Sequence, residues 1–159
     1  MTAGDWIWAF FSLRHRMYTG IAHGALMCLF IGAIIGARAG RPVPGLVAGP
    51  LVGVIAAGAF YLLAPAMRYT AMVPAWMLFW ILFAFLQRWL SGGSLGVALL
   101  RGVVAAVISG VAFYAISGIW TRPSPGGPNY LMHFLHWSFA FLPGFLALFI
   151  GHTGRHSSR

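Results

Sequence analysis

Residues 46–63 read LVAGPLVGVIAAGAFYLL and contain no charged side chain. A helix needs about 20 predominantly apolar residues to cross a hydrocarbon core roughly 30 Å thick. Apolar runs close to this length fill most of the 159-residue chain. We place them at Tyr18–Ala37, Leu46–Leu63, Ala71–Leu90, Val97–Trp120 and Tyr130–Ile150. The sequence therefore predicts an all-α, polytopic membrane protein with five transmembrane helices, whose backbone polar groups are satisfied within the helices.

The composition of the chain supports this class and excludes others. Hydrophobic residues make up 60% of the sequence and charged residues 7%, which leaves too little polar surface for a soluble domain. The formal net charge is +9, but the arginines lie one or two at a time near the ends of the apolar runs. Arginines at such positions bind the phosphate headgroups of lipids. We therefore expect lipid headgroups as partners, and no nucleic acid.

The N-terminal segment differs from a cleavable signal peptide, in which positive charge precedes the apolar stretch. Here the aromatic-rich residues 6–11 come first, and Arg14 and Arg16 follow them. This order favours a helix lying in the membrane interface over residues 1–17. Residues 18–120 then form a unit of four transmembrane helices, and residues 121–159 form a loop, the fifth helix and a basic tail.

The chain resembles itself when it is shifted by 53 residues. Seven of the sixteen residues at 46–61 are identical to their counterparts at 99–114, where roughly two are expected by chance in so biased an alphabet. The identical positions in the first copy are Leu46, Gly49, Val54, Ile55, Ala59, Phe60 and Tyr61. We therefore expect two parallel two-helix repeats, related by an axis along the membrane normal, with the fifth helix outside the repeat.

Two kinds of helix surface are expected. Gly45, Gly49 and Gly53 recur at four-residue spacing, which is typical of helices whose backbones approach closely in lipid. Residues 71–90 and 130–150 instead carry many bulky aromatic side chains. Such crowding predicts surfaces that face lipid or a partner protein.

The arginines also predict an orientation. The side on which the chain begins carries Arg14, Arg16, Arg68 and Arg122, and the other side carries Arg38, Arg41, Arg88, Arg101, Arg155 and Arg159. Because cytoplasmic ends of membrane helices carry the excess of arginine and lysine, the N-terminus is expected outside and the C-terminus in the cytoplasm. The expected location is a bacterial inner membrane.

Three histidines and two tyrosines form the candidate ligand site: His23, His133, His136, Tyr61 and Tyr114. The alternating direction of the helices places them in one layer, roughly 5–10 Å below one membrane surface at a rise of 1.5 Å per residue. Neutral imidazole is a common ligand of haem-type metals, so haem and a chlorophyll-type pigment are candidate ligands. A quinone is the third candidate, because a neutral histidine can also accept a quinol proton. The alternative is that these amphipathic rings are interfacial anchors.

The sequence contains few of the residues that enzymes commonly use for catalysis. Asp5 is the one acidic residue, which excludes paired-carboxylate chemistry and carboxylate-held magnesium. His152 and His156 lie in the basic tail without supporting ligands, so we expect no metal site and no catalytic residue. The expected function is that of a non-catalytic accessory subunit that binds other integral membrane subunits of a larger inner-membrane complex, respiratory or photosynthetic. One alternative is a haem-, pigment- or quinone-binding subunit. The other is a small transporter or channel for an anion or a neutral solute, in which Arg101 would bind the anion.

Overall fold

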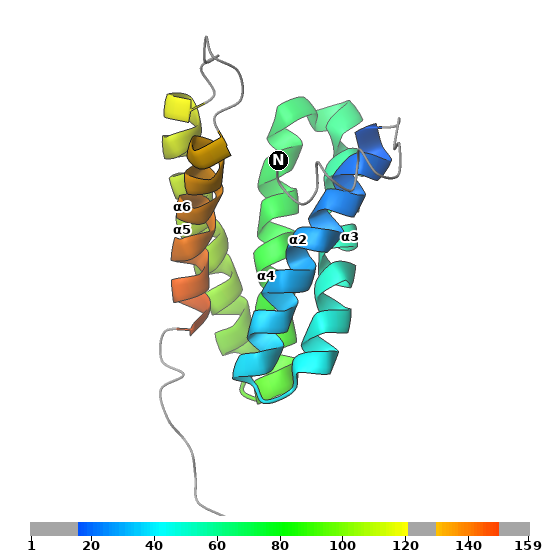
Figure 1. Ribbon diagram of the computed structural model, residues 1–159, viewed down its shortest axis with the longest axis vertical. Coiled ribbons are helices and arrows are strands. Elements are labelled where there is room, and N and C mark those ends of the chain that lie inside the picture. Colours follow the sequence, from blue (N-terminus) through cyan, green and yellow to red (C-terminus); the bar gives the residue numbers. More distant parts are fainter. Residues whose placement is uncertain (1–15, 121–129, 150–159) are drawn as a thin grey trace, which may run out of the picture.

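The computed structural model describes residues 16–120 and 130–149, and all the regular structure of this part is helical (Figure 1). The helices are α2 (Arg16–Arg38), α3 (Pro42–Met67), α4 (Met72–Ser91), α5 (Leu95–Trp120) and α6 (Tyr130–Phe149), with a 3₁₀-helix η1 (Arg68–Ala71) between α3 and α4. Successive helices run in opposite directions. The α2–α3 and α4–α5 turns therefore lie at one end of the bundle, and η1 lies at the other.

Four helical segments are long and apolar enough to cross a membrane by length and composition: Met17–Arg38, Pro42–Met67, Met72–Ser91 and Leu95–Ile116. A shorter apolar helical segment is Trp137–Phe149. The predicted all-α, membrane-protein-like fold is therefore confirmed. Of the predicted interfacial segment 1–17, residues 16 and 17 belong to α2 and the rest lies outside the described residues, as do the loop 121–129 and the tail 150–159.

α2, α3 and α5 are longer than the apolar runs that predicted them, whereas α4 and α6 match theirs to within one residue at each end. α3 begins at Pro42 rather than Leu46, because proline is favoured in the first turn, where its missing N–H leaves no bond unmade. α2 ends before Gly40, whose φ of 69° is the left-handed conformation that commonly terminates a helix. Continuing a helix beyond its apolar run satisfies backbone groups that lipid does not.

α2 and α3 approach each other through glycine. A methyl group added to Gly53 would overlap the carbonyl oxygen of Gly24 and lie 2.8 Å from Cα of Ala25. Additions at Gly32 or Gly45 would likewise overlap backbone atoms of the facing helix. The expected close approach of glycine-bearing helices is confirmed for this hairpin.

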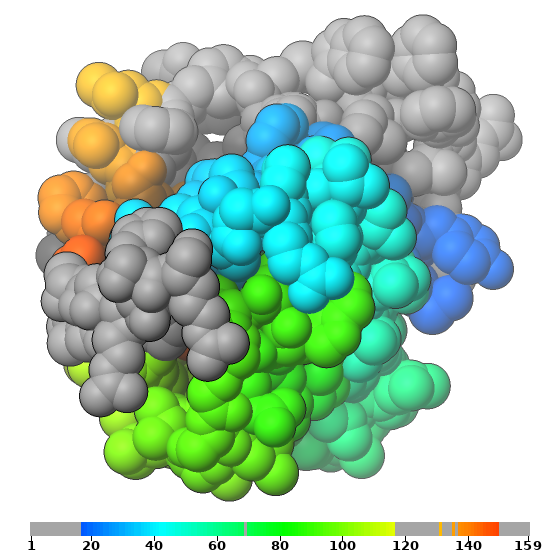
Figure 2. All heavy atoms as spheres, turned by 90° about the horizontal axis from the view of Figure 1, so that it is seen from below, coloured from blue at the N-terminus to red at the C-terminus, as the bar shows by residue number. Residues whose placement is uncertain are grey.

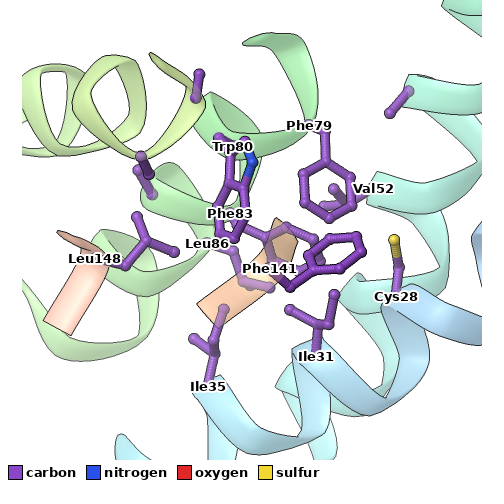
Figure 3. Close-up of a cluster of buried hydrophobic side chains, with 14 of the residues drawn as sticks. Cys28, Ile31, Ile35, Val52, Phe79, Trp80, Phe83, Leu86, Phe141 and Leu148 are labelled. Atoms are coloured by element: carbon purple, nitrogen blue, oxygen red, sulfur yellow. The ribbon is translucent and has the colours of Figure 1, made fainter. Parts of the chain in front are cut away.

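The aromatic side chains of α4 and α6 form the interior of the bundle, so the expectation that they face lipid or a partner is wrong for most of them. Trp76 of α4 lies 5.2 Å from Phe141 of α6 between ring centroids, and Trp80 lies 5.6 Å from Phe145. Figure 3 shows Phe141 among side chains of α2 and α4. Offset and edge-on ring contacts of this kind bury large apolar areas, so facing aromatic helices stabilise each other.

Two further contacts hold α6 in place. The hydroxyl of Ser109 on α5 donates a hydrogen bond to the carbonyl oxygen of Ala140 at 2.5 Å. Gly144 leaves the space that the Trp80 indole occupies, because a methyl group there would overlap the ring. α4 is thus the central helix, packed against α3 and α5 along its length and against α6 through aromatic side chains.

Candidate functional site

Tyr61 closes the space between α2 and α3 near the η1 end of the bundle. Its ring lies over Gly20, where a methyl group would overlap the hydroxyl and come within 2.7 Å of Cε2. His23 lies on α2 one turn beyond Gly20 and is partly buried. His23 and Tyr61 therefore lie on neighbouring helices at similar depth, and their role in a ligand site stays a prediction.

Tyr114 lies on α5, is 45% exposed and borders a cavity of about 230 Å³ between α4 and α5. The cavity is open on one side, and its lining is almost entirely apolar. The lining residues are Met72, Val73, Trp76 and Met77 of α4 with Ala106, Val107, Gly110, Val111, Phe113 and Tyr114 of α5. An apolar cavity bordered by a few polar groups is the usual form of a small-molecule site.

Trp76 lines this cavity with its indole ring. Its indole nitrogen is buried and has no hydrogen-bond partner among the described residues. This nitrogen lies 3.9 Å from the position that a Cβ atom would take at Gly110. Because this nitrogen has almost no accessible surface, it does not face the cavity, and a buried donor without a partner costs free energy.

His133 and His136 lie in the first two turns of α6, and their side chains are outside the described part of the structure. The first turns of α2 and α6 are on opposite sides of α4 (Figure 1). α2 and α6 are also not among the helix pairs that pack closely along their length. Ligand binding by His23 with His133 or His136 stays a prediction.

Arginines at the opposite end of the bundle are held by aromatic and backbone groups. The guanidinium of Arg38 lies 4.5 Å from the ring centroid of Phe149, and that of Arg41 lies 5.4 Å from Trp89. The Nε of Arg88 donates a hydrogen bond to the carbonyl of Gly93 at 3.1 Å. Figure 2, a view onto this end, shows the α2–α3 turn beside the α4–α5 turn. These cations form a positive rim suited to phosphate headgroups.

Polar chemistry is sparse in the interior of the described helices. Within the described residues 16–120 and 130–149, no group of three or more His, Cys, Asp or Glu side chains could hold a metal ion. Gln87 and Ser109 are the buried polar side chains found there, and Cys28 is a buried free thiol. Asp5 lies outside the described residues.

No protein family, no curated protein and no solved structure matches this chain. Function must therefore be argued from the site itself. The sequence-based site did not include Trp76 or Gly110. The 53-residue register pairs Trp76 with the predicted residue His23, so the same shift would have indicated Trp76, whereas Gly110 pairs with Ala57, which was not a predicted site residue.

Proposed function

We propose that the protein is a non-catalytic accessory subunit of a larger inner-membrane complex, where it binds and positions other integral membrane subunits. The observation that carries this proposal is the closed interior of the described bundle, which is filled by aromatic and aliphatic side chains. A transporter for an anion or neutral solute needs a polar path, and this interior offers little to build one. The apolar outer surfaces of α3 and α5 are the candidate contact faces.

We further infer that the chain is an internal duplication of a two-helix hairpin with a fifth transmembrane helix, α6, beside it. The helix bounds support this inference: α5 (Leu95–Trp120) begins and ends 53 residues after α3 (Pro42–Met67). Corresponding contacts within the two hairpins also support it. A Cβ atom at Gly49 would meet the backbone of Cys28, and one at Gly102 would meet the backbone of Ile81, 53 residues further along in both cases.

The buried faces of α3 and α5 agree with the same register. Gly45, Gly49, Val52, Gly53 and Ala56 are buried in α3, and Ala98, Gly102, Ala105, Ala106 and Ser109 are buried in α5. Each member of the second set follows its counterpart by 53 residues, and Phe113 is buried in addition, where its counterpart Phe60 is partly buried. A parallel repeat with an axis along the membrane normal accounts for this agreement.

We infer that the end carrying the α2–α3 and α4–α5 turns is cytoplasmic. In the described part, Arg38, Arg41, Arg88 and Arg101 lie toward this end, and Arg16 and Arg68 lie toward the other. The positive-inside rule then places the N-terminus outside. Anionic lipid headgroups are the partners of the arginine rim.

A second candidate function is binding of a membrane-soluble ligand. The cavity between α4 and α5 favours it, because Tyr114 borders that cavity in the layer predicted to hold a ligand. Haem or pigment ligation would need the histidines of the layer, and a quinone would need only a shaped apolar cavity with a hydrogen-bond donor.

Native electrophoresis of membranes dissolved in mild detergent tests the accessory role. We expect the protein to migrate far above its mass together with other polypeptides, and respiratory and photosynthetic complexes are the first hosts to examine. Leu51 on α3 and Leu100 on α5 are both exposed, so Leu51→Trp and Leu100→Trp alter the two outer faces separately. Whichever of the two helices contacts the host, the variant on that helix should release the protein from the complex. The variant on the other helix should leave the complex intact and serves as the control. A monomer in the unmodified membrane would refute the proposal.

A further inference from the structure

We propose that Arg41, Arg88 and Trp89 form a binding site for the headgroup phosphate of one anionic phospholipid, which bridges the two helical hairpins. The proposal rests on the arginine rim inferred above to contact anionic headgroups, and it names the binding residues and the class of lipid. It depends neither on the orientation of the protein in the membrane nor on its being a subunit of a larger complex.

Arg41 reaches from the first hairpin to the second. It lies in the α2–α3 turn, beside the α4–α5 turn in Figure 2, and its side chain makes no capping hydrogen bond to α3. Its guanidinium instead lies over the ring of Trp89 on α4, 5.4 Å from the centroid. Attraction to an aromatic ring holds the cation in place without giving its N–H groups an oxygen acceptor. Arg41 is therefore positioned by Trp89 to donate hydrogen bonds to a phosphate.

Arg88 supplies a second guanidinium on the same turn of α4. It directly precedes Trp89 in the chain, and both side chains are exposed. The Nε of Arg88 donates to the carbonyl of Gly93 at 3.1 Å, which restrains the side chain and uses one of its five N–H donors. The other donors of a guanidinium form the planar fork that binds two phosphate oxygens at once.

The charge of this end calls for an anion. Residues 16–120 and 130–149 contain no Asp or Glu, and in the whole sequence Asp5 alone stands against ten arginines. Two guanidinium groups restrained at one end of the bundle repel each other, and an anion that binds both relieves this repulsion. A zwitterionic headgroup brings a cation of its own to the site, so a headgroup with net negative charge is favoured.

The surroundings favour a phosphate carried by a lipid over a free phosphate ion. Trp89 is 58% exposed, and Val43, two residues after Arg41, is 68% exposed. Leu46 and Val47 are also exposed and continue this apolar surface along α3. A lipid whose phosphate lies at Arg41 packs its acyl chains against this surface, whereas a free phosphate ion gains no contact from it.

Native mass spectrometry of the purified full-length protein tests the site, because it identifies individual bound lipids by their mass. The protein is released from detergent micelles that contain equal amounts of phosphatidylglycerol, which is anionic, and phosphatidylcholine, which is zwitterionic. Arg41→Gln and Arg88→Gln each remove one cation of the site. Arg68→Gln is the matched control, because it removes the same charge from an exposed residue at the other end of the bundle.

We expect the unmodified protein to retain one phosphatidylglycerol molecule in preference to phosphatidylcholine. Arg41→Gln and Arg88→Gln should each weaken this binding about tenfold or more, as the loss of hydrogen bonds from a charged donor implies, and Arg68→Gln should leave it unchanged. Arg41→Lys keeps the charge but loses the planar fork, so its effect should lie between those of Arg41→Gln and Arg68→Gln. Inorganic phosphate at millimolar concentration should not displace the lipid.

Three outcomes would overturn the proposal. Equal retention of phosphatidylglycerol by the site variants and Arg68→Gln would leave a general attraction between arginines and anionic lipids. Equal retention of the two lipids by the unmodified protein would show that charge does not select the headgroup, and displacement by inorganic phosphate would show a site that is not specific for lipid. Because the isolated protein is measured, these outcomes are independent of the native electrophoresis that tests the accessory role.

Discussion

The glycines of α3 lie in two different environments, which gives them different roles. Gly53 faces the backbone of α2, and atoms added there would meet Gly24 and Ala25, which cannot move aside without separating the helices. Gly58 lies on the same helix with no atom within 4 Å of an added Cβ. Helix association in lipid depends on such close backbone contact.

Gly53→Ala is expected to lower the free energy of unfolding by about 1–3 kcal/mol, because overpacking a rigid contact forces the helices apart. Gly58→Ala should be neutral or stabilise by up to about 1 kcal/mol, since alanine has the higher helix propensity. Unfolding in mixed detergent micelles by increasing fractions of dodecyl sulfate measures both. Equal stability of the two variants would show that α2 and α3 do not pack through glycine.

Among the helices, the contact between α4 and α6 differs most from what the residue pattern predicts. Trp80 is fully buried, and its six-membered ring occupies the space left by Gly144. Its indole nitrogen has no hydrogen-bond partner in the described part of the chain. The contact between Trp80 and Gly144 therefore depends on how their shapes fit, and a larger side chain at residue 144 would require a smaller one at residue 80.

Gly144→Ala should destabilise the protein by about 1–3 kcal/mol, because the added methyl group overlaps the Trp80 ring. Trp80→Phe removes the outer ring atoms that the methyl group would meet, and also removes the unpartnered N–H. The double variant is therefore expected to be more stable than the sum of the single changes predicts, with a coupling of about 0.5–3 kcal/mol. Additive losses in thermal unfolding would contradict this contact.

The described helices are asymmetric in charge along the axis of the bundle, with more arginines toward the end that carries the α2–α3 and α4–α5 turns. Three arginines of the turn-bearing end are held by Phe149, Trp89 and the carbonyl of Gly93. These contacts restrain the guanidinium groups at one level of the bundle. Arg68, at the other end, has a positive φ of 54° and caps α3 through its backbone N–H.

The orientation is tested by reporter fusions after Arg159. A green fluorescent protein fusion should be fluorescent and an alkaline phosphatase fusion inactive, since the C-terminus is expected in the cytoplasm. Replacing Arg38 and Arg41 by Gln should weaken the arginine bias and increase the fraction of reversed molecules. An active phosphatase on the unmodified chain would reverse the assignment.

Several features of the fold could be predicted from the residues themselves. The uncharged stretch 46–63 predicts a spanning helix because unsatisfied backbone groups are costly in lipid. Gly45, Gly49 and Gly53 predict a close helix contact because only glycine lets two backbones meet. The 53-residue register predicts the bounds of α5 from those of α3.

Other features depend on contacts between helices distant in the chain. In a membrane, an aromatic side chain is compatible with lipid and with the interior, so the composition of α4 and α6 does not indicate that their rings face each other. Tyr61 and Tyr114 occupy matching positions in the repeat, yet one closes a space and the other borders a cavity. The facing helix differs between the two: Gly20 lies under the Tyr61 ring, whereas Val73, at the corresponding position, lines the cavity with Tyr114.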